Sequence, residues 1–379
     1  MRKYEISRRK LIVSTITIAL VVATASSVIT YVVAQSGLGV STLSKINFAG
    51  SPDFTVFTDG NGSYYAENVY REIEFSGTDS ASVINDALGS GRHVFLSSGT
   101  YNIDSSIRLS QIDNCLSGDG WSTILTTSLN IDMVVMSGMF SEISNLAING
   151  DKGSSNDGIY ISGQRCRVDN VQIKNTYDGI DVSGTSSMYA LSTSVSRCQI
   201  EQIAGNGINT ANYASDSVVC ENTIGNCSLD AIALSSGGSS AVITGNELWG
   251  SENGLVLYGA RGCTVTGNRI DYNLYDGILV QYTTDNAVTG NNIYCNSMGV
   301  PDTYVGVELA GSRYITVSGN HFGLSSGETQ KFAVLEDGSS NYNAVTRNTC
   351  EPNPNQSYDI LIIGANSAYT GNVARVQHP

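Results

Sequence analysis

The sequence predicts an all-β chain: a right-handed parallel β-helix solenoid of about ten coils, preceded by a capping helix and by an N-terminal transmembrane or signal helix. Between residues 144 and 372 one phrase, typified by Val-Thr-Gly-Asn-Arg-Ile at 265–270, recurs every 22 to 29 residues. Self-similarity at that period is typical of stacked structural units. Apolar and polar residues alternate within each unit, as in Gly179-Ile180-Asp181-Val182, so short strands are predicted rather than helices.

Composition agrees with this fold. The 379 residues include 40 glycines and only five prolines, which suits a solenoid with many tight turns. One unit of roughly 24 residues forms a coil of three short strands, and successive coils lie ~4.8 Å apart, the usual spacing of paired strands.

An asparagine at one place in the repeated phrase is expected to form a ladder along the solenoid. An amide both donates and accepts hydrogen bonds, so asparagines stacked on adjacent coils bond to one another. Leu146, Val171 and Cys198 take this place in the first coils. The column is scaffold, and its asparagines are Asn222, Asn246, Asn268, Asn291, Asn320, Asn348 and Asn372.

Charge and cysteine usage exclude several functions. The net charge of −14 argues against nucleic acid, whose phosphates attract Lys and Arg. The negative charge also disfavours binding of a polyanionic polysaccharide, unless a cation bridges the protein and the polysaccharide. The eight cysteines share no column in adjacent coils and form no Cys-x-x-Cys motif, so most are expected to be small buried residues rather than disulfides or zinc ligands.

The N-terminus predicts export. Residues 1–10 are rich in Lys and Arg, and residues 11–34 carry no charge, so residues 1–36 are expected to be a membrane anchor or a cleaved signal. Either alternative leaves the rest of the chain outside the cytoplasm, at the cell surface or secreted. Residues 37–75 are expected to form a spacer and a hairpin, and residues 76–379 the β-helix.

Two elements are expected ahead of the first coil. Residues 54–57 and 63–66 flank Asp59-Gly-Asn-Gly62 and predict a hairpin. Thr78 or Asp79 is expected to cap a short helix that ends before Gly89. This helix would cover the open apolar end of the solenoid with Ala81, Val83, Ile84, Ala87 and Leu88.

The segments that follow the helix carry a family resemblance. His93-Val-Phe-Leu96, Gly99-Thr-Tyr101 and Leu116-Ser-Gly-Asp-Gly-Trp-Ser-Thr-Ile124 resemble the start of proteins in the pectate-lyase-like superfamily. The later repeats are similar to the β-helix modules of NosD-like and carbohydrate-active proteins, over residues 76–372 in all. The resemblance implies the fold. It leaves lyases, hydrolases, epimerases, tailspikes and non-enzymatic surface proteins open as functions.

Candidate functional residues gather on one wall of the early coils. Residues that follow the first inward Ile of each Gly-Ile strand should point outward, and the acidic residue before each Gly should lie beside them. Asp178 and Asp181 are the candidate catalytic residues, and the candidate substrate-binding residues are Asp157, Tyr160, Asn209 and Lys174. Carboxylates on adjacent coils, ~4.8 Å apart, suit a retaining glycosidase pair or a calcium ion held by Asp157 and Asp178.

A second resemblance concerns the same carboxylates. Asn175-Thr-Tyr-Asp-Gly-Ile-Asp181 is similar to a segment of polygalacturonase-type hydrolases, with Tyr177 as an extra residue. The downstream Gly-Asp-Asp, Gly-His-Gly and Arg-Ile-Lys motifs of those hydrolases are absent, so only Asp178 and Asp181 carry over. Asp before Gly also suits a tight turn, which is the structural alternative.

Three functions therefore remain open: a non-catalytic surface protein that binds carbohydrate or builds the envelope, a calcium-dependent lyase or glycoside hydrolase, and a NosD-like accessory role linked to a metal. The outward apolar run Ala233, Val256 and Leu279 is a candidate homo-oligomer contact. Three sequons predict glycosylation at Asn61, Asn226 and Asn355.

Overall fold

The computed structural model describes residues 51–151, 156–235, 238–323 and 330–378. The predicted N-terminal helix at 11–34 lies outside these residues. Within the part of the chain that is described, no helix is long and apolar enough to cross a membrane.

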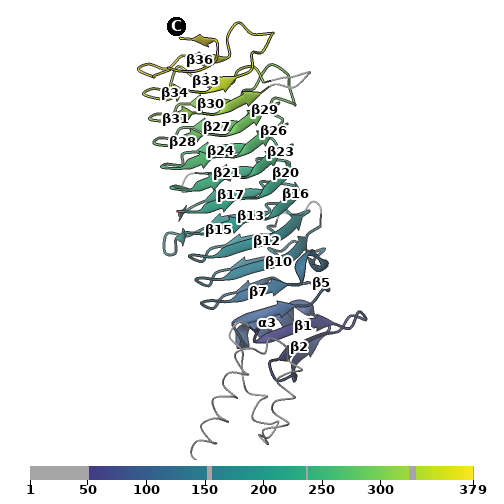
Figure 1. Cartoon of the computed structure of the whole chain (residues 1–379). Coiled ribbons are helices and arrows are strands. Elements are labelled where there is room, and N and C mark those ends of the chain that lie inside the picture. Colours follow the sequence, from purple (N-terminus) through teal and green to yellow (C-terminus); the bar gives the residue numbers. More distant parts are fainter. Residues whose placement is uncertain (1–50, 152–155, 236–237, 324–329, 379) are drawn as a thin grey trace, which may run out of the picture. The chain divides into compact units, whose positions relative to one another are not determined.

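From residue 93 onward the chain forms a parallel β-solenoid with one 12-stranded sheet, here called sheet B. Its strands follow the chain order along the stack and pair in parallel register (Figure 1). They are β6 (Ile107–Leu109), β9 (Val134–Met136), β11 (Ile159–Ile161), β13 (Ile180–Ser183), β17 (Ile208–Ala211), β21 (Ile232–Leu234), β24 (Leu255–Tyr258), β27 (Ile278–Gln281), β30 (Val307–Ala310), β33 (Val334–Glu336), β36 (Ile360–Ile362) and β37 (Val376–Gln377).

The solenoid makes about 11 turns, one more than predicted. β6 and β9 form rungs that precede the first recognisable repeat. In the β9 rung, Met133 takes the place that Gly158 and most of its equivalents occupy in later rungs. The Asp-Gly-Ile phrase therefore cannot be recognised in that rung.

The larger sheet, sheet A, has 23 strands and contributes two rows to each coil. β10 (Glu142–Asn149) and β12 (Arg167–Lys174) each run through both rows. The first row holds β4 (His93–Leu96), β7 (Cys115–Gly118), β15 (Ser194–Ser196), β19 (Val218–Cys220), β22 (Val242–Thr244), β25 (Thr264–Thr266), β28 (Ala287–Thr289), β31 (Thr316–Ser318) and β34 (Ala344–Thr346). The second row holds β5 (Gly99–Asn102), β8 (Thr123–Thr126), β16 (Gln199–Ile203), β20 (Thr223–Cys227), β23 (Glu247–Trp249), β26 (Arg269–Asp271), β29 (Asn292–Tyr294), β32 (His321–Gly323) and β35 (Thr349–Cys350).

The predicted asparagine ladder is confirmed, and Asn268 shows its geometry. The Nδ2 of Asn268 donates to the Oδ1 of Asn291 at 2.9 Å and to the carbonyl of Ile243 at 3.0 Å. Its Oδ1 accepts from both the backbone nitrogen and the Nδ2 of Asn246. The same pattern continues from Asn222 to Asn372, so each buried amide satisfies its neighbours on both sides.

The turn before each ladder position contains one residue in the left-handed region. This residue is Gly267 at φ 67° in the Asn268 coil, and it is Glu221 at 58° and Arg347 at 57° in others. A residue in this conformation turns the chain sharply, so the next strand of the coil can begin without an intervening loop. Glu and Arg are strained in the left-handed conformation, and the hydrogen bonds of the asparagine ladder offset that strain.

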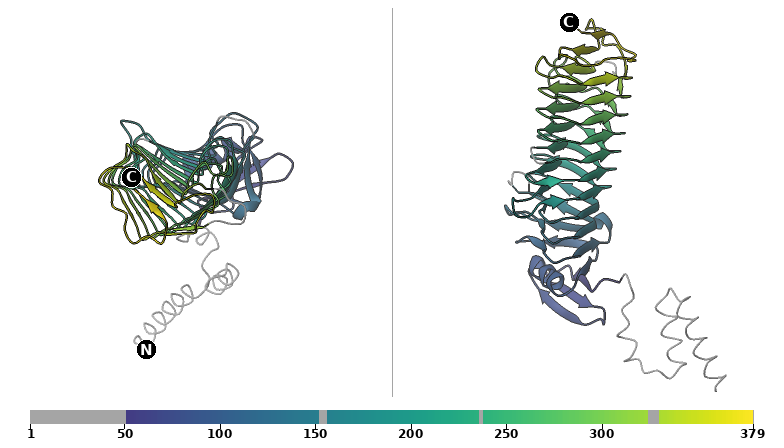
Figure 2. Two further views of the ribbon diagram at one scale, coloured as in Figure 1. Left: turned by 90° about the horizontal axis from the view of Figure 1, so that it is seen from above. Right: turned by 90° about the vertical axis from the view of Figure 1, so that its left-hand side faces the viewer.

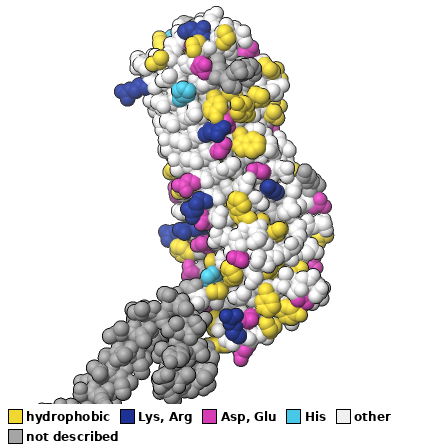
Figure 3. Space-filling view, turned by 45° about the vertical axis from the view of Figure 1, so that its right-hand side comes forward, with side chains coloured by type: hydrophobic (Ala, Val, Ile, Leu, Met, Phe, Trp, Pro, Cys, Tyr) yellow, Lys and Arg dark blue, Asp and Glu magenta, His cyan; other side chains and the backbone are white. Residues whose placement is uncertain are grey.

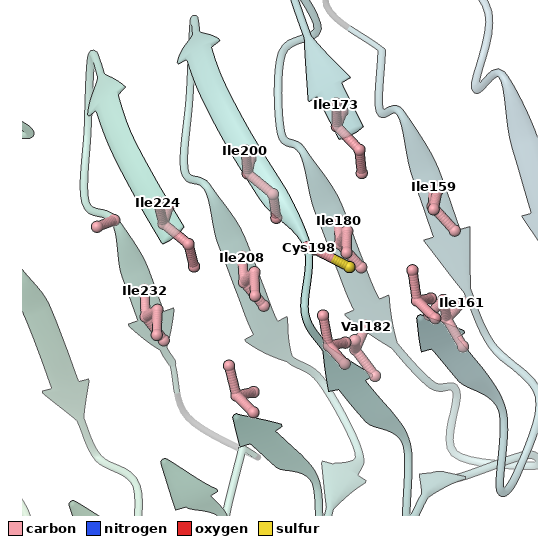
Figure 4. Close-up of a cluster of buried hydrophobic side chains, with 14 of the residues drawn as sticks. Ile159, Ile161, Ile173, Ile180, Val182, Cys198, Ile200, Ile208, Ile224 and Ile232 are labelled. Carbon is pink, nitrogen blue, oxygen red and sulfur yellow. The ribbon is translucent and has the colours of Figure 1, made fainter. Parts of the chain in front are cut away.

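The interior is filled by columns of aliphatic side chains. Ile159, Ile180, Ile208 and Ile232 lie on successive rungs of sheet B and are buried (Figure 4). All eight cysteines are free thiols, and six of them are buried, as predicted. Inward aliphatic residues of similar size on neighbouring rungs pack closely. Figure 2 shows the rungs stacked in chain order, from the side and from above.

The first coil is covered as expected. Helix α3 (Ser80–Ser90) begins after Asp79, whose carboxylate accepts from the backbone nitrogen of Ala81 at 2.9 Å. The helix ends later than predicted, because Gly89 lies inside it and Gly91 forms the C-cap. The hairpin strands β1 (Phe54–Thr58) and β2 (Tyr64–Asn68) pair antiparallel, β3 (Ile73–Gly77) extends them, and β1 also pairs with β4.

Candidate functional site

The outward wall of sheet B has the predicted register. Tyr160 of β11 lies beside Asp181 of β13, and Asp181 lies beside Asn209 of β17. Their neighbours along each strand point inward and are buried, so these three side chains share one outer face. The sequence pattern therefore places them on adjacent rungs without any contribution from loops.

Asp181 is the centre of a hydrogen-bonded group on this face. Its Oδ1 accepts from the Nδ2 of Asn209 at 2.9 Å and from the Oγ of Ser183 at 3.0 Å. The hydroxyl of Tyr160 donates to the carbonyl of Ser183 at 3.2 Å. Asn209 thus joins the next rung to the Asp181 carboxylate, and Tyr160 joins the preceding rung to the backbone of Ser183; these bonds hold the carboxylate in position.

A second acidic column precedes the same strands. Asp132, Asp157 and Asp178 occupy equivalent positions on the rungs of β9, β11 and β13. The Oδ1 of Asp178 accepts from the backbone nitrogen of Asn206 at 2.6 Å, and the Oδ1 of Asp132 accepts from that of Asp157 at 3.4 Å. These bonds between neighbouring rungs support the structural interpretation of Asp before Gly.

Burial and mutual repulsion shift the titration of this group, which we call the carboxyl cluster (Asp132, Asp157, Asp178 and Asp181). Burial, together with the charges of the other three members, raises the pKa of Asp157 to about 8. Burial raises the pKa of Asp178 to about 6 and also raises the pKa of Asp181. At neutral pH Asp157 therefore keeps its proton and can donate a hydrogen bond, while a neighbouring carboxylate accepts.

Exposed tyrosines lie on both edges of the cluster. Tyr177 directly precedes Asp178, and it is 40% exposed. Beyond the other ends of β13 and β17 lie Tyr189 and Tyr213, whose rings meet edge to face with centroids 5.3 Å apart. The carboxyl cluster is thus a polar centre between apolar ring surfaces.

Lys174 is placed elsewhere. It ends β12 in sheet A, and its Nζ lies 3.7 Å from the Oε2 of Glu201. Basic and acidic side chains lie beside one another in small groups on the face in Figure 3, and the ion pairs of Arg197 with Asp169 and of Arg269 with Glu247 are of this kind. Lys174 therefore lies in a different sheet from Asp181, and its role in substrate binding stays a prediction.

The remaining predicted residues have definite places. Ala233, Val256 and Leu279 follow Asn209 in register along sheet B. They are largely or partly buried, and their role as an oligomer contact stays a prediction. The sequon residues Asn61, Asn226 and Asn355 are exposed, and glycosylation likewise stays a prediction.

Among the described residues, no group of three or more His, Cys, Asp or Glu side chains is arranged to hold a metal ion. The predicted calcium pair, Asp157 and Asp178, therefore has no third such ligand within that part of the chain. Sequence reasoning missed Asp132, which Met133 disguises, and it missed the edge tyrosines, which lie in turns.

Comparison with solved structures shows the same fold in proteins of low sequence identity. The A-module of mannuronan C-5 epimerase AlgE6 from Azotobacter vinelandii matches with a TM-score of 0.62 at 14% identity, over 79% of this chain and 94% of that module. A DFA-IIIase from Arthrobacter chlorophenolicus A6, without its lid and in complex with GF2, matches with a TM-score of 0.61 at 13% identity, over 85% and 99% of the two chains. The enzymatically active domain of tailspike protein 2 from bacteriophage CBA120 gives 0.63 at 14% identity, over 78% of this chain and 50% of that one.

No curated protein sequence matches this chain. One family model does, in two overlapping segments, residues 123–323 and 194–369, which together span most of the solenoid. The repeats, the ladder and this match lead to one conclusion: the chain belongs to the family described as "Periplasmic copper-binding protein (NosD)".

Proposed function

We propose that this chain is an exported protein that binds glycan at the carboxyl cluster of sheet B. The observation that carries the proposal is the set of carboxyl groups on adjacent rungs, one of them protonated at neutral pH, beside Tyr160. The family's description as periplasmic supports export. The uncharged segment 11–34 would serve as the signal or the membrane anchor.

Sugars fit the chemistry of this surface. A hydroxyl group both donates and accepts, so it can accept a hydrogen bond from a protonated Asp157 and donate one to a carboxyl oxygen of Asp181. The C–H faces of a sugar ring can pack on the edge tyrosines Tyr177, Tyr189 and Tyr213, which combine a flat apolar body with a polar tip. Protonation of Asp157 also reduces the local negative charge. The strands hold all these groups in fixed register before any ligand arrives.

The comparisons support the substrate class without naming the glycan. The epimerase acts on mannuronan by its name, and the DFA-IIIase was solved with the ligand GF2. Identities of 13% and 14% show a shared fold alone. The proposal therefore extends only to carbohydrate as a class.

Copper, which the family description names, does not fit the described residues. Copper is held by thiolate, thioether or imidazole groups. Burial raises the pKa of the Cys198 and Cys227 thiols to about 12, so these thiols resist the deprotonation that metal binding needs. His93 and His321 contact Ser117 and Asn292 on separate rungs. No part of the proposal uses copper.

Catalysis is a second candidate, favoured by the unequal titration of Asp157 and its neighbours. A protonated carboxyl beside an ionised one is the arrangement of a glycosidase acid and its partner. In this alternative Asp157 donates a proton to the leaving oxygen, and Asp178 or Asp181 acts as base or nucleophile. Calcium would enter as a bridge between Asp157, Asp178 and oxygen atoms of the glycan itself.

The test is a titration of the purified protein with neutral and acidic oligosaccharides, with and without calcium, followed by calorimetry. Asp181→Asn keeps the shape but removes a charge, and it should weaken binding about tenfold, the usual effect of losing a charged hydrogen bond. Asp86→Asn, on the exposed side of α3, is the matched control and should leave the affinity unchanged. Equal affinities for the two variants, or no binding by the unmodified protein to any member of the panel, would overturn the proposal.

The same samples separate binding from catalysis. New reducing ends indicate hydrolysis, and new absorbance from unsaturated products indicates a lyase. Cleavage that Asp181→Asn abolishes would establish the enzymatic alternative, whereas binding without cleavage would establish the non-catalytic one.

A further inference from the structure

A second pair of exposed tyrosines lies on the same edge of sheet B as Tyr213. Tyr258 is the last residue of β24, and Tyr282 directly follows β27 on the next rung. Their rings meet edge to face with centroids 5.9 Å apart. The exposed fractions are 46% and 64%, so both rings present apolar surface to solvent.

The ring of Tyr282 is held in place by a glycine on the following rung. A Cβ atom at Gly311 would lie only 2.7 Å from the Cδ1 of Tyr282, so the ring rests directly on the backbone there. Gly311 also has φ 61°, which glycine adopts without strain. One side of the ring is thereby fixed while much of the rest stays exposed. Because the ring is already ordered, little conformational entropy is lost when a ligand packs against it.

The strand residues between the carboxyl cluster and this tyrosine pair are uncharged and follow one another in register, while Asp230 and Asp276 precede two of these strands. Register runs from Asp181 through Asn209, Ala233 and Val256 to Leu279. These four rung steps cover ~19 Å at the usual strand spacing. The C–H faces of sugar rings suit the apolar side chains of Val256 and Leu279 on this floor.

We propose that the glycan bound at the carboxyl cluster is a linear polysaccharide that runs along the solenoid axis and stacks on Tyr258 and Tyr282. This inference rests on the proposed function and extends it. The ligand has to be long enough to span the ~19 Å that four rungs cover, so it has to be an oligosaccharide or polysaccharide rather than a single sugar. Its distal units should be neutral rather than anionic, because the described strand residues Ala233, Val256 and Leu279 provide no basic group and Asp230 and Asp276 precede two of these strands.

The test measures affinity against oligosaccharide length in one homologous neutral series. For the unmodified protein, affinity should rise about tenfold once the chain is long enough to reach the second tyrosine pair. The double variant Tyr258→Ala/Tyr282→Ala should lose this rise and bind short oligosaccharides as before. The control is Tyr314→Ala/Tyr342→Ala, a stacked pair with centroids 5.7 Å apart and exposed fractions of 56% and 53%, which lies in a different turn and should retain the rise.

The outcomes distinguish this inference from the proposed function. If short oligosaccharides bind but affinity does not depend on length, or if both double variants lose the rise equally, the inference is wrong and the proposed function stands. If no oligosaccharide of any length binds, both are wrong. The tyrosine pair could instead form a contact between two copies of the chain, which sedimentation of the same variants tests. A change in association state without a change in glycan affinity would identify such a contact and overturn the inference. Thermal melting confirms that each variant is folded.

Discussion

Replacing Asn268 by leucine is expected to lower the free energy of unfolding by about 3 to 5 kcal/mol. Leucine has nearly the same shape, but it removes an acceptor for two donors of Asn246 and a donor to Ile243 and Asn291. The loss leaves buried polar groups on both neighbouring rungs without partners, and each unsatisfied group costs about 1 to 3 kcal/mol. The first coils use Leu146 and Val171 at this place because there the adjacent residue is apolar too.

Urea unfolding followed by circular dichroism measures this effect. Asn292→Leu is the matched control, because Asn292 belongs to the same coil as Asn291 but points outward and is exposed. Its substitution should change stability by less than about 0.5 kcal/mol. Comparable small effects for both variants would show that the ladder does not hold the coils together.

Asp157→Asn is expected to stabilise the protein at alkaline pH, by about 2 kcal/mol at pH 8 after allowance for partial exposure. Burial and the neighbouring carboxylates raise the pKa of Asp157 to about 8, from 3.8 in the unfolded chain. Between these two pH values the folded state keeps a proton that the unfolded state has lost. The contribution of Asp157 is therefore complete below about pH 4 and is lost as pH rises toward 8. The amide of asparagine has no proton to lose in this range.

Stability measured from pH 4 to pH 8 in both proteins tests the prediction. Asp178 and Asp276 also have raised pKa values, at about 6 and about 8, and they add to the slope of both proteins, so the difference between the two curves is the informative quantity. The curves should coincide near pH 4 and separate above it. Parallel curves would mean that Asp157 titrates normally. A more stable variant with weaker glycan binding would identify the cluster as a site maintained at a cost in stability.

Much of the fold could be predicted because the repeat expresses it many times. The period-2 alternation fixes which side chains face inward, and the strict parallel register then carries Tyr160, Asp181 and Asn209 to one face. The asparagine ladder followed from the chemistry of a buried amide at a repeated position.

The rest depends on geometry that the repeat does not express. Asp132 lies in register with Asp157, but its rung lacks the glycine that marks the phrase. Lys174 and Asp178 are four residues apart, yet a coil turns between them, so they belong to different sheets. Tyr213 and Tyr282 lie at left-handed turn positions, with φ of 57° and 52°, and their ring directions follow from those turns rather than from strand alternation.

Carbon-13 spectra of the aspartate carboxyl groups, recorded against pH and against added oligosaccharide, test most directly whether the carboxyl cluster is the glycan site. The account predicts that Asp157 titrates near pH 8 and that glycan moves the resonances of Asp157, Asp178 and Asp181 while that of Asp86 stays fixed. A normal titration of Asp157, with a bound glycan that leaves all three cluster resonances in place, would contradict it.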